Sequence, residues 1–266
     1  MAKKFSVVSW NIEHFSLKTT HHDKIIAHLK ALQPDIFALL EVEGKDVWRY
    51  MFDEFPEHSF FITEGEQTQE IMVGIHRQLK CFFTQRTEFK SGRTSLRPGS
   101  FLTVRIDGEN YNLLFLHLKS MTHPEGFGLR DDMFQHAFRL KRVLEEVAGE
   151  GNRAKFIFMG DLNTMGLDYP YKRAIEASVE IKRLAGRARA NGMRLLSKDH
   201  ESTWTNGRGL YSDLDGVVAS KSITFQTWGG KHVKVIGWNQ YPPESAEFKE
   251  FVNKVSDHCA LYCEVH

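Results

Sequence analysis

The sequence of 266 residues predicts an α/β fold in which two mixed β-sheets pack together and helices cover the outside. Apolar runs typical of strands are joined partly by helical segments and partly by hairpin turns, in both halves of the chain. These runs are too numerous for one open sheet with simply alternating helices. No Pro/Gly/Ser-rich linker, low-complexity tract or short repeat interrupts the chain, so we expect residues 1–266 to form a single domain.

In the first half, strands and helices alternate before a series of strands. We expect a strand at 5–10, an amphipathic helix at 22–33, a strand at 36–41, a helix near 44–54, and three or four strands between 58 and 118. Asp107 and Gly108 separate two apolar runs, which indicates a hairpin turn.

The second half contains the longest helical pattern. We expect a helix at 129–149, a strand at 155–160, helical sequence from about 168 to 190, short strands near 203, 215 and 223, a helix at 244–254, and a final strand at 259–265. Long irregular segments, which are candidate rims of a cleft, lie at 63–70, 91–99, 119–128 and 205–213.

The overall charge and the cysteine content exclude several classes of protein. The 35 Lys and Arg residues balance 34 Asp and Glu residues, so the net charge of +1 provides no strong overall attraction for nucleic acid. The first apolar run is too short for a signal peptide or a membrane span, so we expect a cytoplasmic protein with no membrane insertion. The sequence indicates no obligate protein partner. Three cysteines without a C-x-x-C pair indicate neither a disulfide framework nor a zinc ribbon.

Hard polar side chains follow the ends of several apolar runs. They are Asn11, Glu13, Glu41, His117, Asp161, Asn163, Asp215, Asp257 and His258. Any one of these Asp or Asn residues could be an ordinary turn former. Their number, and their placement after runs that read as buried strands, favour one shared site. Oxygen donors and imidazoles are the groups that a hard divalent cation and a proton-transfer pair require.

Six segments carry a resemblance to a known family: SWNIEHF, DIFALLEVE, FLHLKS, FMGDLNT, LDGVV and SDHCALY. In this order and at about this spacing, they make the chain similar to the endonuclease/exonuclease/phosphatase superfamily of DNase-like metallohydrolases. The resemblance extends from residue 9 to the end of the chain. It implies a four-layer α/β/β/α sandwich and Mg²⁺- or Mn²⁺-dependent hydrolysis of phosphoesters at the strand ends.

A metal site is expected around Glu41. A carboxylate at the end of an apolar strand would be costly to bury without a partner, and a cation is its natural one. Asn11 offers a neutral oxygen beside it. The resemblance implies that Asn11 and Glu41 hold the metal, with Glu13 as a further acidic position of lower rank, and it leaves Asp257 available for metal as well.

The remaining strand-end residues are candidates for the catalytic steps. The resemblance implies that Asp161 is a general base or second metal ligand, that Asn163 is an orienting amide, and that Asp215 is the partner of His258. Either Asp161 or the His258–Asp215 pair could activate water, and the sequence does not choose between them. His117 stands where apurinic-site endonucleases of the superfamily have Tyr. A His here is similar to pancreatic-type DNases, sphingomyelinases, inositol phosphatases and deadenylases, and could protonate the leaving oxygen or stabilise charge.

Three basic residues are candidate phosphate contacts. Lys119 and Arg130 flank the loop after His117, and Arg97 belongs to a basic cluster of a kind that is more often a solvated face. The reading we prefer is a phosphodiesterase that acts on DNA or RNA. The alternatives are a phosphatase or phosphodiesterase for a lipid headgroup, an inositol phosphate or another small phosphoester, and a non-catalytic binding domain of the same fold.

Overall fold

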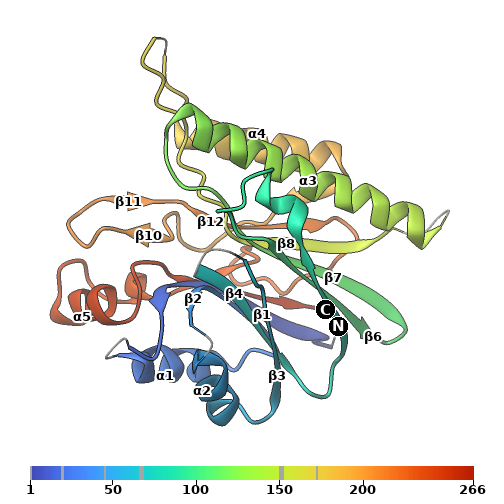
Figure 1. The fold of residues 1–266 in the computed structure, drawn as a ribbon, viewed down its shortest axis with the longest axis horizontal. Coiled ribbons are helices and arrows are strands. Elements are labelled where there is room, and N and C mark those ends of the chain that lie inside the picture. The colour runs from blue at the N-terminus through green and yellow to red at the C-terminus, as the bar shows by residue number, and fades with distance from the viewer. Residues whose placement is uncertain (1, 19–20, 45, 66–68, 150–152, 172) are drawn as a thin grey trace.

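Two six-stranded mixed sheets pack against each other, and helices cover their outer faces (Figure 1). A computed structural model describes residues 2–18, 21–44, 46–65, 69–149, 153–171 and 173–266. The strands of the first sheet, in spatial order, are β13 (Lys234–Ile236), β14 (Ala260–Val265), β1 (Phe5–Phe15), β2 (Ile36–Glu43), β4 (Gln69–His76) and β3 (His58–Ile62). Those of the second sheet are β5 (Lys80–Arg86), β6 (Gly99–Ile106), β7 (Glu109–His117), β8 (Lys155–Asp161), β12 (Asp215–Ser220) and β9 (Met193–Leu195).

The helices complete a four-layer arrangement. Figure 1 shows α1 (His22–Leu32) and α2 (Asp46–Glu54) outside the first sheet, and α3 (Pro124–Ala148) and α4 (Ala177–Ala190) outside the second. The helix α5 (Ala246–Lys254) and the short ribbon of β10 (Trp204–Thr205) and β11 (Tyr211–Ser212) lie at one end of the sandwich, and both chain termini lie at the other. This confirms the predicted α/β sandwich. Within the described residues, no helix is both long and apolar enough to cross a membrane.

Alternation along the strands produces the layers. On β7, Leu113 and Phe115 belong to the core between the sheets, whereas Leu114 and Leu116 pack in the second core, with α3 and α4. Successive side chains of a strand point to opposite faces, so a strand buried on both faces is apolar throughout. This is why the strands that lead to the site are near-continuous apolar runs.

Local sequence chemistry sets several boundaries. The hairpin between β6 and β7 turns at Asp107 and Gly108, with φ of 53° and 79°, as the Asp-Gly pair predicts. The helix α3 begins five residues earlier than predicted because Pro124 occupies its first turn, and the side chain of His123 accepts a hydrogen bond from the Glu125 amide. Residues 124–128, which were predicted to be irregular as part of the segment 119–128, are therefore helical.

Some predicted elements differ from the structure. The helix expected from about residue 168 begins only at Ala177, because Leu167 and Ile175 pair as an antiparallel bridge around Pro170. No strand forms at Ile223, where the chain turns. Among the described residues between 58 and 118 there are five strands, rather than three or four, and the short strands β9, β11 and β13 were not predicted.

Candidate active site

Strand register brings the predicted residues to one edge of the two sheets. In the second sheet, His117 pairs with Asp161 and Asp161 pairs with Asp215, across three neighbouring strands. In the first sheet, Asn11 on β1 pairs with the residue before Glu41 on β2. The carboxyl ends of parallel strands meet at the same sheet edge. Side chains from positions 11 to 258 of the sequence therefore converge.

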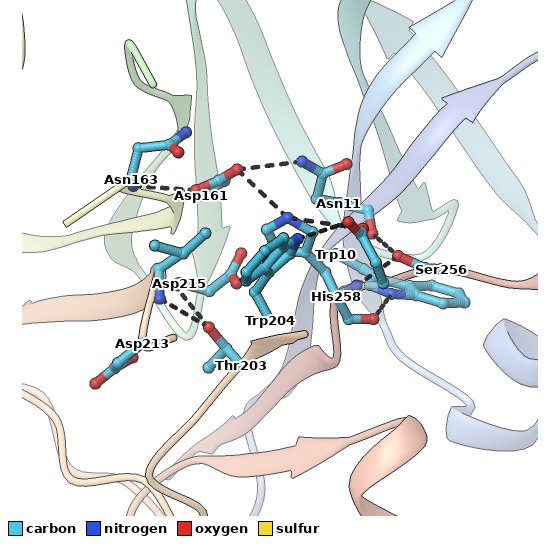
Figure 2. Close-up of polar contacts among 12 residues, drawn as sticks. Trp10, Asn11, Asp161, Asn163, Thr203, Trp204, Asp213, Asp215, Ser256 and His258 are labelled. Atoms are coloured by element: carbon cyan, nitrogen blue, oxygen red, sulfur yellow. Dashed lines mark hydrogen bonds and ion pairs between the residues drawn. The ribbon is translucent and has the colours of Figure 1, made fainter. Parts of the chain in front are cut away.

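The amide of Asn11 connects the two sheets. Its Nδ2 donates to Glu41 Oε1 and to Asp161 Oδ2, both at 3.1 Å (Figure 2 shows the contact with Asp161). Its Oδ1 accepts a hydrogen bond from the Glu13 amide at 3.1 Å. Asn11 and Asp161 are 2% exposed, so this contact is closed to bulk water.

The acidic residues fit a hard divalent cation. Burial raises the pKa of both Asp257 and Glu13, and neighbouring carboxylates raise it further. The Oδ1 atom of Asp257 is buried and has no hydrogen-bond partner among the described residues, while Oδ2 accepts from Trp204 Nε1 at 2.6 Å. Oxygen donors that repel one another are stabilised by a cation. Glu41, Asp257 and Glu13 could therefore hold one. Asn11 turns its amide nitrogen toward Glu41, and a half-turn of that amide would add its Oδ1 to the set. A second group of possible ligands, Asp161, Asp215 and His258, lies within 4.8 Å of one another.

His258 and Asp215 form the predicted pair. The Nδ1 of His258 lies 2.8 Å from Asp215 Oδ2, and its Nε2 lies 3.9 Å from Asp161 Oδ2. Burial alone would lower the pKa of His258, but the carboxylates of Asp215, Asp161 and Asp257 together outweigh burial and raise the pKa to about 10. Burial, together with the charge of Asp215, raises the pKa of Asp161 to about 7. The structure thus places a ring whose imidazolium form is favoured beside a carboxyl group whose pKa is raised.

Backbone contacts hold the His258 ring in place. The backbone amide of His258 donates to Ser256 Oγ at 2.9 Å, and that hydroxyl donates to the Asn11 carbonyl at 2.7 Å. The indole of Trp10 donates to the His258 carbonyl at 3.0 Å (Figure 2). These contacts fix the loop before β14 to β1. They thereby hold His258 next to Asn11, one of the candidate metal ligands.

His117 faces the same centre from β7. Its Nε2 lies 3.5 Å from Glu41 Oε1 and 3.6 Å from Asp161 Oδ2. Burial lowers the pKa of His117 well below its ordinary value, and the positive charges of Arg97 and His258 lower it further. A neutral imidazole results, which suits hydrogen bonding to developing charge better than delivery of a full proton.

Asn163 lies in a strained turn after β8. Its φ is 48°, its amide donates to Asp161 Oδ1 at 3.0 Å, and its Nδ2 donates to the Leu118 carbonyl at 3.1 Å. Glu41 and Glu13 also have left-handed backbones, with φ of 65° and 48°. Such strain persists where the surrounding structure fixes it, and it is concentrated at functional sites.

The three predicted phosphate contacts have different environments. Arg97 lies beside the site, where its Nε donates to the Gln69 carbonyl at 3.1 Å and its charge acts on Glu41 and Asp161. Lys119 follows β7 and is half-buried, and its charge reaches His117. The assignment of Arg130 as a phosphate contact is wrong. Its side chain is 0% exposed and its donors are occupied by protein acceptors, because it is the partner of Glu180.

Residues that were not predicted complete the rim. His14 contacts Glu43 and faces Glu41, and the side-chain amide of Gln69 lies next to both His14 and Glu41. For these residues the sequence offered one indication, which was that His14 directly follows the predicted site residue Glu13. The indole of Trp204 also belongs to the rim, where it donates to Asp257.

Several solved structures share this fold. Truncated TDP2 from Caenorhabditis elegans superposes with a TM-score of 0.68 at 18% identity, over 98% of this chain and 96% of that one. TDP2 from D. rerio, complexed with single strand DNA product, gives 0.64 at 16% identity over 98% of both chains. The Bacteroides thetaiotaomicron mannosyl-6-phosphatase gives 0.63 at 14% identity, over 98% of this chain and 99% of that one.

Sequence comparison is consistent with this. Among proteins with curated descriptions, none is significantly similar in sequence. A sequence model of the Endonuclease/Exonuclease/phosphatase family, however, matches residues 8–258, a range that includes every strand-end residue described above. The chain therefore belongs to the endonuclease/exonuclease/phosphatase family of phosphoesterases.

Proposed function

We propose that this protein is a Mg²⁺- or Mn²⁺-dependent phosphodiesterase that hydrolyses nucleic acid by in-line attack of water. The observation that carries the proposal is the convergence of Asn11, Glu41, Asp161 and His258 at the junction of the two sheets. A divalent ion held by Glu41 and its neighbours would supply positive charge for the developing oxyanion. Cations from Arg97 and Lys119 border the site and suit a phosphate backbone.

Asp161 is the general base in this proposal. Burial raises the pKa of Asp161 to about 7, near neutral pH, where a base is most effective, whereas neighbouring carboxylates, Asp215 first, raise the pKa of His258 and favour its imidazolium form. The imidazolium of His258, oriented by Asp215, then stabilises negative charge on the phosphate. Asn163 orients the Asp161 carboxylate through its backbone amide, and neutral His117 donates a hydrogen bond to an oxygen of the reacting group.

A nucleic-acid substrate is favoured by the fold neighbour that was solved with single strand DNA product. A small phosphoester is the second candidate, and it is favoured by the mannosyl-6-phosphatase neighbour and by the net charge of +1. A plasmid, an oligonucleotide with blocked ends, bis(p-nitrophenyl) phosphate and a sugar phosphate, each with and without chelator, separate the two. We expect chelator-sensitive cleavage of both nucleic acids and of the diester. Turnover of the sugar phosphate alone would support the second candidate.

Two substitutions test the chemistry. We expect Asp161→Asn and His258→Ala each to lower metal-dependent turnover by at least about a hundredfold, within the range of a general base or a charge-stabilising group. Asp107→Asn is the matched control, because it makes the same chemical change in an exposed turn at the opposite end of β7 from His117. If both site variants stay within a few-fold of wild type, the proposal is refuted.

A further inference from the structure

A local irregularity of β1 brings His14 beside Glu41. Asn11 pairs with Leu40 and Phe15 pairs with Val42, so three residues of β1 lie opposite the single residue Glu41. Extra residues of this kind re-aim side chains, and they are common next to active sites. Here they place the imidazole of His14, which is 59% exposed, at the rim of the site.

The two nitrogens of His14 have different surroundings. Nδ1 lies 2.5 Å from Glu43 Oε1, so the carboxylate accepts its proton and fixes the tautomer. In the neutral ring the lone pair is then on Nε2, which lies 3.7 Å from Glu41 Oε2. Two lone pairs that face each other repel, unless a proton or a metal ion lies between them.

The separation of these atoms suits a shared metal ion. Two ligands at about 2.1 Å from a divalent ion are about 3 Å apart at a right angle and about 3.4 Å apart at a tetrahedral angle. The observed 3.7 Å is a few tenths of an ångström longer, so a bound ion would draw the two atoms slightly together. The Gln69 amide nitrogen lies 3.3 Å from His14 Nε2 and 3.4 Å from Glu41 Oε2. If the amide rotates by half a turn, its carbonyl oxygen becomes a third donor.

We propose that His14 is a nitrogen ligand of the divalent ion held by Glu41, and that Glu43 orients it. The inference rests on the proposed function, because it assumes that Glu41 binds a metal ion. A carboxylate that accepts the other ring proton is the usual companion of a metal-binding histidine. Glu41 is shared in this arrangement, since its Oε1 faces Asn11 and its Oε2 faces His14.

The consequence is selectivity among metals. Mg²⁺ prefers an all-oxygen shell and retains its waters, whereas imidazole favours first-row transition ions. Mn²⁺ binds most weakly in that series and is therefore the most stringent probe. His14 shifts the preference of the site from Mg²⁺ toward Mn²⁺.

Metal binding without turnover provides the test. We expect His14→Ala to weaken Mn²⁺ binding by about tenfold or more, and Mg²⁺ binding by no more than about threefold, by calorimetric titration of the full chain. Pulsed electron paramagnetic resonance of bound Mn²⁺ should show an imidazole ¹⁴N coupling that is lost or reduced in this variant. Glu43→Gln, which keeps an oxygen acceptor, should weaken Mn²⁺ binding by less than His14→Ala does.

Two controls separate the possible failures. His76→Ala removes a histidine at the opposite end of β4 from Gln69, and it should leave both affinities unchanged. Glu41→Gln should abolish binding of both metals; if it does not, the proposed metal site itself is wrong. If Glu41→Gln abolishes binding but His14→Ala leaves the Mn²⁺/Mg²⁺ ratio and the ¹⁴N coupling unchanged, or tightens both metals equally, His14 is a charged partner of Glu41 and the inference is refuted.

Discussion

Replacement of Arg130 by Met should destabilise the protein severely, although the residue lies outside the reacting centre. The guanidinium is 0% exposed, and it donates to Glu180 from Nε at 2.8 Å and from Nη2 at 3.1 Å. Its Nη1 donates to the carbonyls of Lys119 and Met121 at 3.1 and 2.8 Å, and its Nη2 also donates to the Gly166 carbonyl at 2.8 Å. One side chain thus joins α3 to α4 and to the loops that follow β7 and β8.

The size of the effect follows from what the substitution leaves behind. Glu180 is 5% exposed, and in Arg130→Met its carboxylate would keep, among the described residues, only the hydrogen bond from the Gly166 amide at 2.7 Å. An uncompensated buried charge of this kind costs about 3–5 kcal/mol. Because the double variant Arg130→Met/Glu180→Met removes both charges, it should lose less stability than the sum of the single variants.

Urea unfolding followed by circular dichroism measures these free energies. Arg139→Met, an exposed position on the same helix, is the control and should stay within about 0.5 kcal/mol of wild type. The buried ion pair does not hold the loops as described if Arg130→Met loses less than about 1 kcal/mol of unfolding free energy with an unchanged dependence on urea concentration. The same conclusion follows if the double variant loses the full sum of the losses of the two single variants.

Three further predictions concern the strands, the metal ligands and pH. A Cβ atom at Gly160, whose φ is 143°, would lie 1.9 Å from the Leu116 carbonyl oxygen, so Gly160→Ala should lower the free energy of unfolding by about 3 kcal/mol or more; a urea midpoint close to wild type would contradict this. Trp204→Phe removes the hydrogen bond to Asp257 and should weaken Mg²⁺ binding about tenfold with little change in melting temperature, and an unchanged calorimetric Kd would exclude this role. Burial lowers the pKa of His58 below 6.5, so the unfolded chain binds the proton first and the stability from this residue is lost as pH falls below about 6.5. Wild type should therefore lose more stability than His58→Gln between pH 7.5 and 5.5, by at most about 1.4 kcal/mol per pH unit, and parallel stability curves would refute it.

The sequence was informative where burial and chemistry impose a pattern. Strands buried on both faces must be apolar throughout, so the polar residue that ends each run, such as Glu41 or Asp161, is conspicuous. For this reason, the sequence alone indicated most of the polar residues that the strands of both sheets bring together.

Other features depend on contacts that no local pattern encodes. Arg130 follows the predicted site loop in sequence, but its helix face turns inward toward Glu180, fifty residues away. The composition of the segment after residue 168 favours a helix, but Leu167 and Ile175 form an antiparallel bridge instead. Pro170 was the one residue in the segment that argued against a helix. Tertiary packing overrides local propensity in such segments.

The role of His14 was hidden for a different reason. Its position beside Glu41 depends on the extra residues in β1, which shift the pairing between Asn11 and Phe15. A shift in register between two strands leaves no reliable trace in hydrophobic alternation, because both strands are apolar at this point.

The most direct test of the account is the anomalous difference density of a crystal soaked in Mn²⁺. We predict that the strongest peak lies within coordinating distance, about 2.2 Å, of a Glu41 carboxylate oxygen. A saturating soak that produces no peak beside Glu41, or a peak only at a site remote from Asn11 and Asp161, would contradict the claim that these strand ends form a metal-dependent hydrolytic centre.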